Sequence, residues 1–306
     1  MEKILLQIQD ETSTLKEVVL GTAVSNGKTP SVEDAYDPKS IENIKAGTYP
    51  KEEDMVKEMT AFELALKKHG VTVYRPKVID DYNQIFSRDI GFVIEDKFIK
   101  SNILPDREKE LDAIQYVLDN IDNDKIVRLP DDCHIEGGDV MPHGYYIFIG
   151  TYRGQDYPDY ITARTNEKGV QAIQDLFPTK KVKSFNLRKS NTNAKENALH
   201  LDCCFQPVGK NKAIIHKNGF LEEEEYQWLV DLFGRENVFE IDKQEMYDMT
   251  SNIFSISPEV VVSDKHFKRL NDWLRSNGIT VEEISYREIA KQEGLLRCST
   301  LPLRRI

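Results

Sequence analysis

Apolar and polar positions along the chain follow two different periods, which predict a mixture of helices and strands. Apolar side chains at mostly helical steps, each run closed by a glycine, predict helices over 51–69 and 266–277. Short β-branched and apolar runs such as 15–20 and 260–263 predict strands. By the same criteria the other expected helices are 107–120, 167–177 and 222–233. The other expected strands are 3–8, 71–76, 91–99, 145–150, 181–185, 213–216, 238–241 and 279–284.

A helix, a glycine and a strand follow one another in similar form at 68–74 and at 275–284. Quasi-repeats of roughly 50–60 residues are typical of folds assembled from repeated modules, as in propeller architectures. No linker or low-complexity stretch divides the chain, so we predict one α/β domain over residues 1–306. The segment 21–47 lacks periodicity and is rich in turn-forming residues. A loop of this length is usually functional or disordered.

The composition is that of an acidic globular protein. The chain has 306 residues, of which 40% are hydrophobic, and this is enough to fill a sizeable core. The formal net charge of -11 argues against nucleic acid or an anionic membrane as the main partner, because phosphate binding needs clustered Lys and Arg. An acidic surface instead suits a small cationic ligand. The sequence leaves the oligomeric state, including a homo-oligomer, open.

The four cysteines, Cys133, Cys203, Cys204 and Cys298, include an adjacent pair and no C-x-x-C spacing. They favour neither a disulfide framework nor a zinc ribbon, and they suit a reducing cytosol. The apolar run within residues 1–8 is too short for a signal peptide, and no segment approaches the ~18 apolar residues of a membrane span. We therefore expect a cytoplasmic protein.

The last stretch of the chain, 294–306, carries an apolar pair, then Cys298 with small hydroxylated residues, and then a proline. Chain ends usually fray, so this pattern predicts a short strand and turn that hold the thiol in a defined place. A free cysteine is most often a small buried hydrophobe. Three earlier stretches, however, hold the carboxylates and the imidazole that a nucleophilic thiol needs.

These stretches each have a structural alternative. Glu136 and Asp139 flank a glycine pair that lets the backbone turn or approach a ligand, although the same pattern fits an acidic turn. His200 and Asp202 begin a strand-like run in which alternate residues share a face, so both would project together. A buried structural histidine or half of a divalent-metal site are the alternatives there. Asp89 precedes a predicted strand, where an Asp also caps turns.

A thiol, an imidazole and several carboxylates suggest covalent catalysis on a cation. A guanidinium ion fits, because it is planar, stays charged at physiological pH and donates bidentate hydrogen bonds to carboxylates. No glycine-rich phosphate loop of the P-loop or Rossmann type is present.

At these residues the sequence resembles the guanidino-group-modifying superfamily, which comprises arginine deiminases, dimethylarginine dimethylaminohydrolases and amidinotransferases. The matching motifs lie in the same order as in the family, between residues 83 and 303. They are N-x-x-F-x-R-D at 83–89, an Arg at 107, E-G-G-D at 136–139, R-T-N at 164–166, H-x-D at 200–202 and C-x-T-x-P-L at 298–303.

The resemblance implies the pentein fold, a pseudo-fivefold α/β propeller of ββαβ modules. It implies that Cys298 is the nucleophile and that His200 is the general acid and then the general base. Glu136 and Asp89 would clamp the guanidinium group, and Asp202 would hold its other nitrogens. The residues that would hold an α-amino-acid end are Asn83, Arg107 and Arg164. The resemblance implies no metal and no other cofactor.

The resemblance also bears on the reaction. The glycine pair after Glu136 is similar to that of the hydrolases rather than of glycine amidinotransferases, and Asp202 resembles the carboxylate that takes an unsubstituted guanidinium. The chain lacks room for the helical insertion of arginine deiminases, and its start is more similar to dimethylarginine hydrolases. We therefore expect a hydrolase similar to arginine deiminase. The alternatives are a dimethylarginine dimethylaminohydrolase, then an amidinotransferase, a metallohydrolase with His200 and Asp202 as ligands, and a non-catalytic pentein-fold binding protein.

Overall fold

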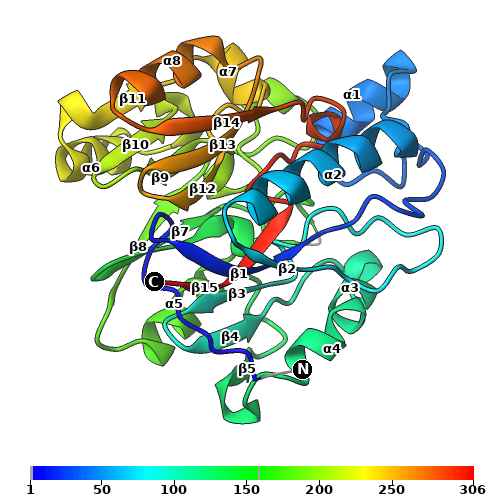
Figure 1. The fold of residues 1–306 in the computed structure, drawn as a ribbon, viewed down its shortest axis with the longest axis horizontal. Helices are drawn as coiled ribbons and strands as arrows, with labels where there is room; N and C mark the ends of the chain where they lie inside the picture. Colours follow the sequence, from blue (N-terminus) through cyan, green and yellow to red (C-terminus); the bar gives the residue numbers. More distant parts are fainter. Residues whose placement is uncertain (1–2, 158) are drawn as a thin grey trace.

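The computed structural model describes residues 3–157 and 159–306, and in this part of the chain the strands form five three-stranded sheets (Figure 1). Each sheet repeats one arrangement. Its first two strands are antiparallel, and a crossover that contains a helix leads to a third strand parallel to the second. Parallel neighbours require such a crossover, whereas antiparallel ones need only a turn. The predicted pseudo-fivefold series of ββαβ modules is confirmed.

The first module joins the two ends of the chain. Strand β15 (Thr300–Arg305) pairs antiparallel with β1 (Leu15–Leu20), and β1 runs parallel to β2 (Thr72–Tyr74). Helix α2 (Glu52–Lys68) makes the crossover between β1 and β2. Figure 1 shows β15 and β1, from the red and blue ends of the chain, side by side. The last strand of the chain thus completes the first sheet.

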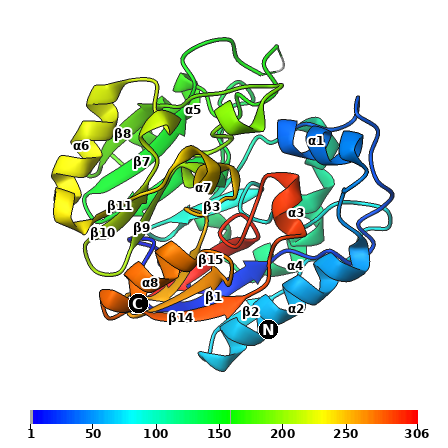
Figure 2. The same ribbon diagram turned by 90° about the horizontal axis from the view of Figure 1, so that it is seen from above.

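The other four modules are built from consecutive strands. Their strands are β3 (Gly91–Ile94), β4 (Lys97–Lys100), β5 (Ile126–Arg128), β6 (Val140–His143), β7 (Tyr146–Thr151), β8 (Lys181–Asn186), β9 (Phe205–Val208), β10 (Lys212–Ile215), β11 (Val238–Glu240), β12 (Phe254–Ser257), β13 (Val260–Asp264) and β14 (Thr280–Ile284). Their crossovers contain α3 (Lys109–Ala113) with α4 (Gln115–Leu118), α5 (Glu167–Leu176), α6 (Glu223–Phe233) and α8 (Lys268–Ser276). Helix α1 (Pro38–Ala46) precedes α2 in the connection from β1 to β2, and α7 (Lys243–Tyr247) lies between β11 and β12. Figure 2 shows the helices on the outside of the strands.

The predicted strand at 3–8 is wrong as an element. The apolar side chains of Ile4 and Ile8 are buried, as the alternation suggests. Their backbone partners, however, lie in different segments, because Ile4 pairs with Asn120 whereas Ile8 pairs with Glu95. A ladder needs one continuous partner strand, and the described part of this segment has none.

Two predicted elements are subdivided. The strand expected over 91–99 is the hairpin of β3 and β4, in which Glu95 takes a left-handed φ of 54° and reverses the chain. The helix expected over 107–120 is divided into α3 and α4 at Ile114, whose φ of -104° and ψ of 8° leave the helical region. Apolar periodicity finds such segments but does not show where they bend.

The segment 21–47, expected to be a loop, contains helix α1. Asp37 accepts a hydrogen bond from Ser40 N (2.7 Å) at the start of the helix, and Gly47, with a φ of 67°, ends it. Apolar periodicity does not reveal this helix, because it is short and mostly polar and its buried residues are Pro38, Lys39 and Ser40. Its position near the mouth of the cavity described below explains why polar residues are used there.

The hydrophobic core supports the C-terminal turn. Phe62 of α2 packs edge-on against Tyr286, with ring centroids 5.7 Å apart. The hydroxyl of Tyr286 lies 3.0 Å from that of Ser299, the residue after Cys298. The turn at 296–299 and strand β15 agree with the predicted turn and strand. A chain end that would otherwise fray is thereby fixed to the core.

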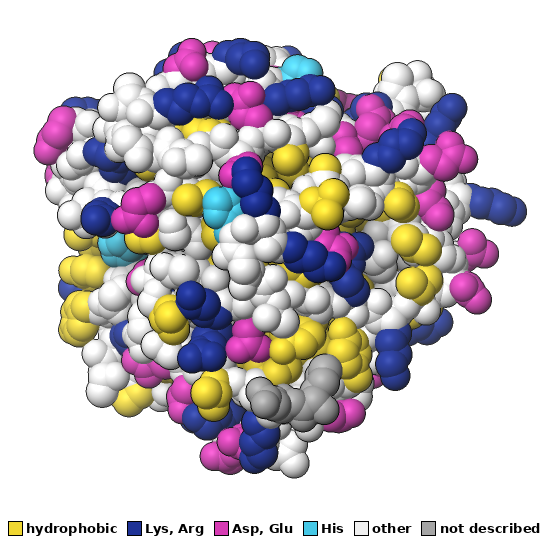
Figure 3. Space-filling view, in the orientation of Figure 1, with side chains coloured by type: hydrophobic (Ala, Val, Ile, Leu, Met, Phe, Trp, Pro, Cys, Tyr) yellow, Lys and Arg dark blue, Asp and Glu magenta, His cyan; other side chains and the backbone are white. Residues whose placement is uncertain are grey.

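Acidic and basic side chains are interspersed on the face that Figure 3 shows, with apolar side chains in small groups between them. In the described part of the chain, none of the helices combines the length and apolarity that crossing a bilayer requires.

Candidate active site

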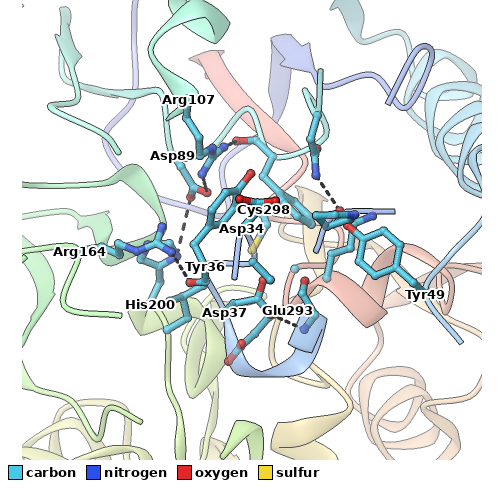
Figure 4. A pocket seen from close by; sticks show the side chains of 18 residues that line it. Asp34, Tyr36, Asp37, Tyr49, Asp89, Arg107, Arg164, His200, Glu293 and Cys298 are labelled. Carbon is cyan, nitrogen blue, oxygen red and sulfur yellow. Dashed lines mark hydrogen bonds and ion pairs between the residues drawn. The ribbon is translucent and has the colours of Figure 1, made fainter. Parts of the chain in front are cut away.

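The predicted catalytic residues lie just before the first strands of four modules. Asp89 precedes β3, Glu136 precedes β6, His200 precedes β9 and Cys298 precedes β15. Because the modules repeat one arrangement, the same end of each sheet faces the same central space. Residues from 89 to 298 are thereby brought to one cavity, in which Figure 4 shows Cys298 between Asp89, His200 and Glu293.

Six of the eight predicted site residues line this cavity: Asn83, Asp89, Arg107, Arg164, His200 and Cys298. The other two, Glu136 and Asp202, do not line it but contact residues that do. The Oε2 atom of Glu136 lies 2.8 Å from Nε2 of His200, and Oδ2 of Asp202 lies 3.6 Å from Sγ of Cys298.

The imidazole of His200 lies between two carboxylates. Nε2 bonds to Glu136, and Nδ1 lies 3.8 Å from Oδ1 of Asp89. Burial alone would lower the pKa of His200, but the charges of Asp89 and Asp139 and the hydrogen bond to Glu136 outweigh it and raise the pKa above its usual value. For Glu136, burial acts in the opposite direction, yet Arg164 and His200 lower the pKa to about 2. The arrangement therefore favours a protonated His200 beside an ionised Glu136.

The glycine pair after Glu136 makes room for this arrangement. A Cβ on Gly138 would lie 2.6 Å from Cγ of the His200 ring, and a Cβ on Gly137 would lie 2.2 Å from the carbonyl oxygen of Arg88. Both distances are too short for any other residue type. The groups that approach the glycines closely are the imidazole and a backbone carbonyl, and the predicted close approach to a ligand stays a prediction.

The thiol of Cys298 is buried beside carboxylates. Burial raises its pKa well above the usual value, and the charges of Asp202 and Asp89 raise it further. Asn252 Nδ2 lies 3.1 Å from the sulfur and is a donor to it. A bound cation that offsets these carboxylates would favour the thiolate.

Asp202 pairs with an arginine that the sequence analysis did not assign. Nη1 of Arg297 donates to Oδ2 of Asp202 (2.8 Å), and both side chains are fully buried. The other arm of Arg297 pairs with Glu11, at 3.0 Å from Nε. The prediction that Asp202 holds nitrogens of the substrate stays a prediction, and any such contact would share the carboxylate with Arg297.

The argument that placed His200 and Asp202 on one face of a strand is wrong. Residues Leu201–Cys203 form a 3₁₀ turn, and strand β9 begins only at Phe205. In that turn the two side chains take different directions, because His200 reaches the cavity and Asp202 reaches Arg297.

The two arginines expected at the α-amino-acid end are held by carboxylates. Arg107 donates to Asp89 (2.8 Å) and to Glu110 (2.7 Å). Arg164 lies 3.4 Å from Glu136 and donates to the carbonyl of Tyr36 (2.9 Å). The two guanidinium groups thus reach the cavity wall in fixed orientations.

Residues 30–49, here called the cover segment, form one wall of the cavity. This segment contributes Tyr36, Asp37 and Tyr49, which Figure 4 labels around the thiol. Next to this segment, Glu293 accepts hydrogen bonds from Asn197 (2.7 Å) and from the backbone N–H of Lys39 (3.4 Å). Burial and the neighbouring Asp37 raise the pKa of Glu293 well above its usual value. No sequence motif marks these residues, and the length of the aperiodic segment 21–47 indicated only a functional or disordered loop.

Three side chains of the site, Asp89, Glu136 and His200, each present a potential ligand atom within 4.8 Å of the others. Nε2 of His200 is already bonded to Glu136, and Oδ2 of Asp89 to Arg107, whereas Oδ1 of Asp89 has no hydrogen-bond partner among the described residues. Asp202 is not part of this group, whereas the metallohydrolase alternative needs it beside His200. We assign none of these residues as a metal ligand.

Exhaustive dialysis against a chelator is therefore expected to leave the rate of turnover unchanged. The physical reason is that the proposed chemistry needs only a thiol, an imidazole and carboxylates. The measurement compares the rate before and after dialysis and after manganese or zinc is added back. A rate that falls on dialysis and returns with either metal would favour the metallohydrolase.

A family model described as N,N dimethylarginine dimethylhydrolase, eukaryotic, matches residues 30–305. The chain belongs to this family. Membership in the dimethylarginine dimethylhydrolase family confirms the predicted guanidino-group-modifying superfamily. Among curated relatives, the uncharacterized protein YkgA of Bacillus subtilis (strain 168) is 29% identical over 243 residues, which are 78% of this chain and 76% of that protein.

Solved structures show the same fold at low identity. The N-terminal domain of ArgZ, an arginine dihydrolase from cyanobacteria, has a TM-score of 0.78 at 17% identity and covers 94% of this chain and 98% of its own. Inosamine-phosphate amidinotransferase StrB1 from Streptomyces griseus has a TM-score of 0.74 at 17% identity, with coverage of 99% and 97%. The dimethylarginine dimethylhydrolase from Pseudomonas aeruginosa has a TM-score of 0.70 at 17% identity, with coverage of 94% and 99%.

Proposed function

We propose that this protein hydrolyses the guanidino group of arginine or of an arginine derivative through a covalent intermediate on Cys298. The observation that carries the proposal is the state of Asp89 in the cavity. Oδ1 of Asp89 is buried and has no hydrogen-bond partner among the described residues, while Oδ2 pairs with Arg107. An unpaired buried acceptor costs about 1–3 kcal/mol, and an N–H of a guanidinium ion would satisfy it.

The bound cation also activates the nucleophile. Burial and the carboxylates of Asp202 and Asp89 raise the pKa of the thiol. A guanidinium that pairs with Asp89 offsets the negative charge of that carboxylate and thereby lowers the pKa of the thiol. Glu136, which contacts Nε2 of His200, keeps the imidazole oriented and protonated. Positioning of the two reactants in this way contributes several kcal/mol to catalysis.

The reaction then proceeds in two halves. The thiolate of Cys298 forms a bond to the guanidinium carbon, and His200 gives its proton to the nitrogen that leaves as the C–N bond breaks. His200 next takes a proton from water, whose oxygen attacks the same carbon and displaces the thiolate. The products are a ureido compound and ammonia, or an amine when the leaving nitrogen is alkylated.

The second candidate substrate is N,N-dimethylarginine, which the match to the dimethylarginine dimethylhydrolase family favours. The third candidate is amidino transfer, in which an amine rather than water attacks the same intermediate. The test is incubation with arginine, methylarginines, agmatine, guanidinoacetate and citrulline, with and without glycine or ornithine, followed by assay of ureido product, ammonia and amine. Formation of none of these products from any of the compounds would overturn the proposed hydrolysis.

Asp202→Asn separates the two roles that this carboxylate could have. The ion pair with Arg297 and the contact with the thiol lead us to expect equal losses of kcat, roughly tenfold or more, on arginine and on dimethylarginine. If Asp202 instead binds the substrate, as the sequence predicts, KM for arginine alone should rise. On that view the wild type should prefer arginine to dimethylarginine by at least roughly tenfold, and the preference should be smaller in Asp202→Asn. The measurement is kcat and KM on both substrates.

A further inference from the structure

One module supplies an active-site residue that no sequence motif marked. Asn252 lies just before β12, the first strand of its module, as Asp89, Glu136, His200 and Cys298 lie before theirs. Each of the five modules that the structure describes thus presents one polar side chain from the same position. The side chain of Asn252 is fully buried, so its amide must find its hydrogen bonds inside the protein.

Both ends of this amide contact the same residue. Oδ1 accepts a hydrogen bond from the backbone N–H of Cys298 (3.2 Å), and Nδ2 lies 3.1 Å from its sulfur. A backbone N–H can only donate, so the atom that faces it must be the amide oxygen. The NH₂ group is therefore the part that faces the sulfur, and the orientation follows from the hydrogen bonds themselves.

The turn that carries Asn252 is fixed from several sides. The amide N–H of Asn252 donates to the carbonyl of Met249 (2.9 Å), a residue with a left-handed φ of 66°. The hydroxyl of Ser251 donates to the backbone carbonyl of Asp202 (2.9 Å). The donor is thus held in place before any substrate arrives, which is the property required of an electrostatic contribution to catalysis.

We propose that Asn252 is the fifth active-site residue, and that its Nδ2–H donates a hydrogen bond that stabilises the attacking thiolate of Cys298. A thiolate accepts a hydrogen bond more strongly than a thiol does, so the donor favours the reactive form. The proposal deepens the proposed function, since it rests on Cys298 as the nucleophile. The titratable and charged groups around the sulfur are Asp89, Asp202, Cys203, His200, Tyr286, Glu293 and Arg297.

Two variants separate this role from support of the turn alone. Asn252→Asp keeps an oxygen for the N–H of Cys298 but replaces the donor with a second oxygen. Asn252→Ala removes both contacts and adds no charge. The matched control is Ser251→Ala, which removes a neighbouring buried hydrogen bond in the same turn and does not touch the sulfur.

The experiment is alkylation of the intact protein by iodoacetamide between pH 7 and 11, with modification of Cys298 followed by peptide mass spectrometry. Both Asn252 variants are expected to raise the midpoint of alkylation by about one pH unit or more. Below the midpoint, the smaller fraction of thiolate slows alkylation. A thiolate of higher pKa is more nucleophilic, which offsets part of this loss, so the net slowing should be at least about threefold. Ser251→Ala should keep the midpoint of the wild type.

Turnover provides the second readout. In both Asn252 variants kcat should fall by about tenfold or more with KM nearly unchanged, because Asn252 is absent from the cavity lining among the described residues. Thermal unfolding identifies any variant that fails to fold. If one of the two Asn252 variants does not fold, the alkylation midpoint of the other one tests the proposal. A folded Asn252→Ala with the alkylation midpoint of the wild type would overturn the proposal, even if Asn252→Asp differed. Alkylation needs no substrate, so a shifted midpoint supports Asn252 even if no guanidino compound is turned over.

Discussion

Replacement of Cys298 by serine should abolish turnover, with a loss of kcat on the order of 10⁴-fold or more. The serine hydroxyl can occupy the same place before β15, but its pKa is far too high for it to form the anion beside Asp202 and Asp89. The bound guanidinium would then meet a neutral hydroxyl, and the covalent intermediate would not form. The measurement is the steady-state rate together with mass spectrometry of the protein under substrate.

The other three cysteines supply the controls. Cys133→Ser, Cys203→Ala and Cys204→Ala should each keep the rate within a few-fold of the wild type. Cys203 and Cys204 are buried, so their variants should lose about 1–2 kcal/mol of stability without a matching loss of activity. An equal loss of activity in a folded Cys203→Ala protein would contradict the assignment of the nucleophile.

Replacement of Arg297 by methionine should have the largest effect on stability, about 3–5 kcal/mol of the free energy of unfolding. The fully buried guanidinium pairs with Glu11 and Asp202, and it also donates to the backbone carbonyl of Val140 (2.8 Å). Without it, two buried carboxylates lose their main partner. The measurement is urea unfolding at pH 7. Arg269→Met is the matched control, because it breaks an exposed pair with Glu245 and should cost less than about 1 kcal/mol.

The pH dependence gives a further check on the same variant. Burial would raise the pKa of Glu11, but Arg297 and Arg88 outweigh it and lower the pKa from 4.5 to about 2. A lowered pKa in the folded state means that the contribution to stability is present above pH 4.5 and is lost as the pH falls toward 2. The difference in stability between the wild type and Arg297→Met should therefore narrow over that window. A difference that stays constant down to pH 2 would show that Glu11 does not depend on Arg297.

Patterns of a few consecutive residues predicted those structural features that depend on neighbouring residues alone. The repeat of helix, glycine and strand indicated modules, and the final stretch indicated a turn and a strand at Cys298. The glycine pair at 137–138 indicated a close approach of backbone and ligand-binding groups. Each of these depends on a few consecutive residues, whose conformational preferences act without help from the rest of the chain.

The parts that could not be predicted depend on contacts between distant segments. Arg297 stands next to the nucleophile in sequence, but its partner Glu11 comes from the opposite end of the chain, and no spacing rule connects them. Asn252 lies in no recognisable motif. It is an active-site candidate only because it occupies the same position in its module as the other four residues do in theirs. The predicted direction of the Asp202 side chain was wrong, because Asp202 lies in a 3₁₀ turn that follows His200 and not in a strand.

The pairing of β15 with β1 sets an order of events during synthesis. Of the described strands β1 is translated first and β15 last, so β1 has no antiparallel neighbour while the strands between them are made. During that interval one edge of β1 stays unpaired, which is the condition under which nascent chains associate wrongly. The thiol arrives in the same final segment as the missing strand. A chain without residues 298–305 therefore has neither a complete first sheet nor Cys298, and the proposed reaction requires that the first module has closed.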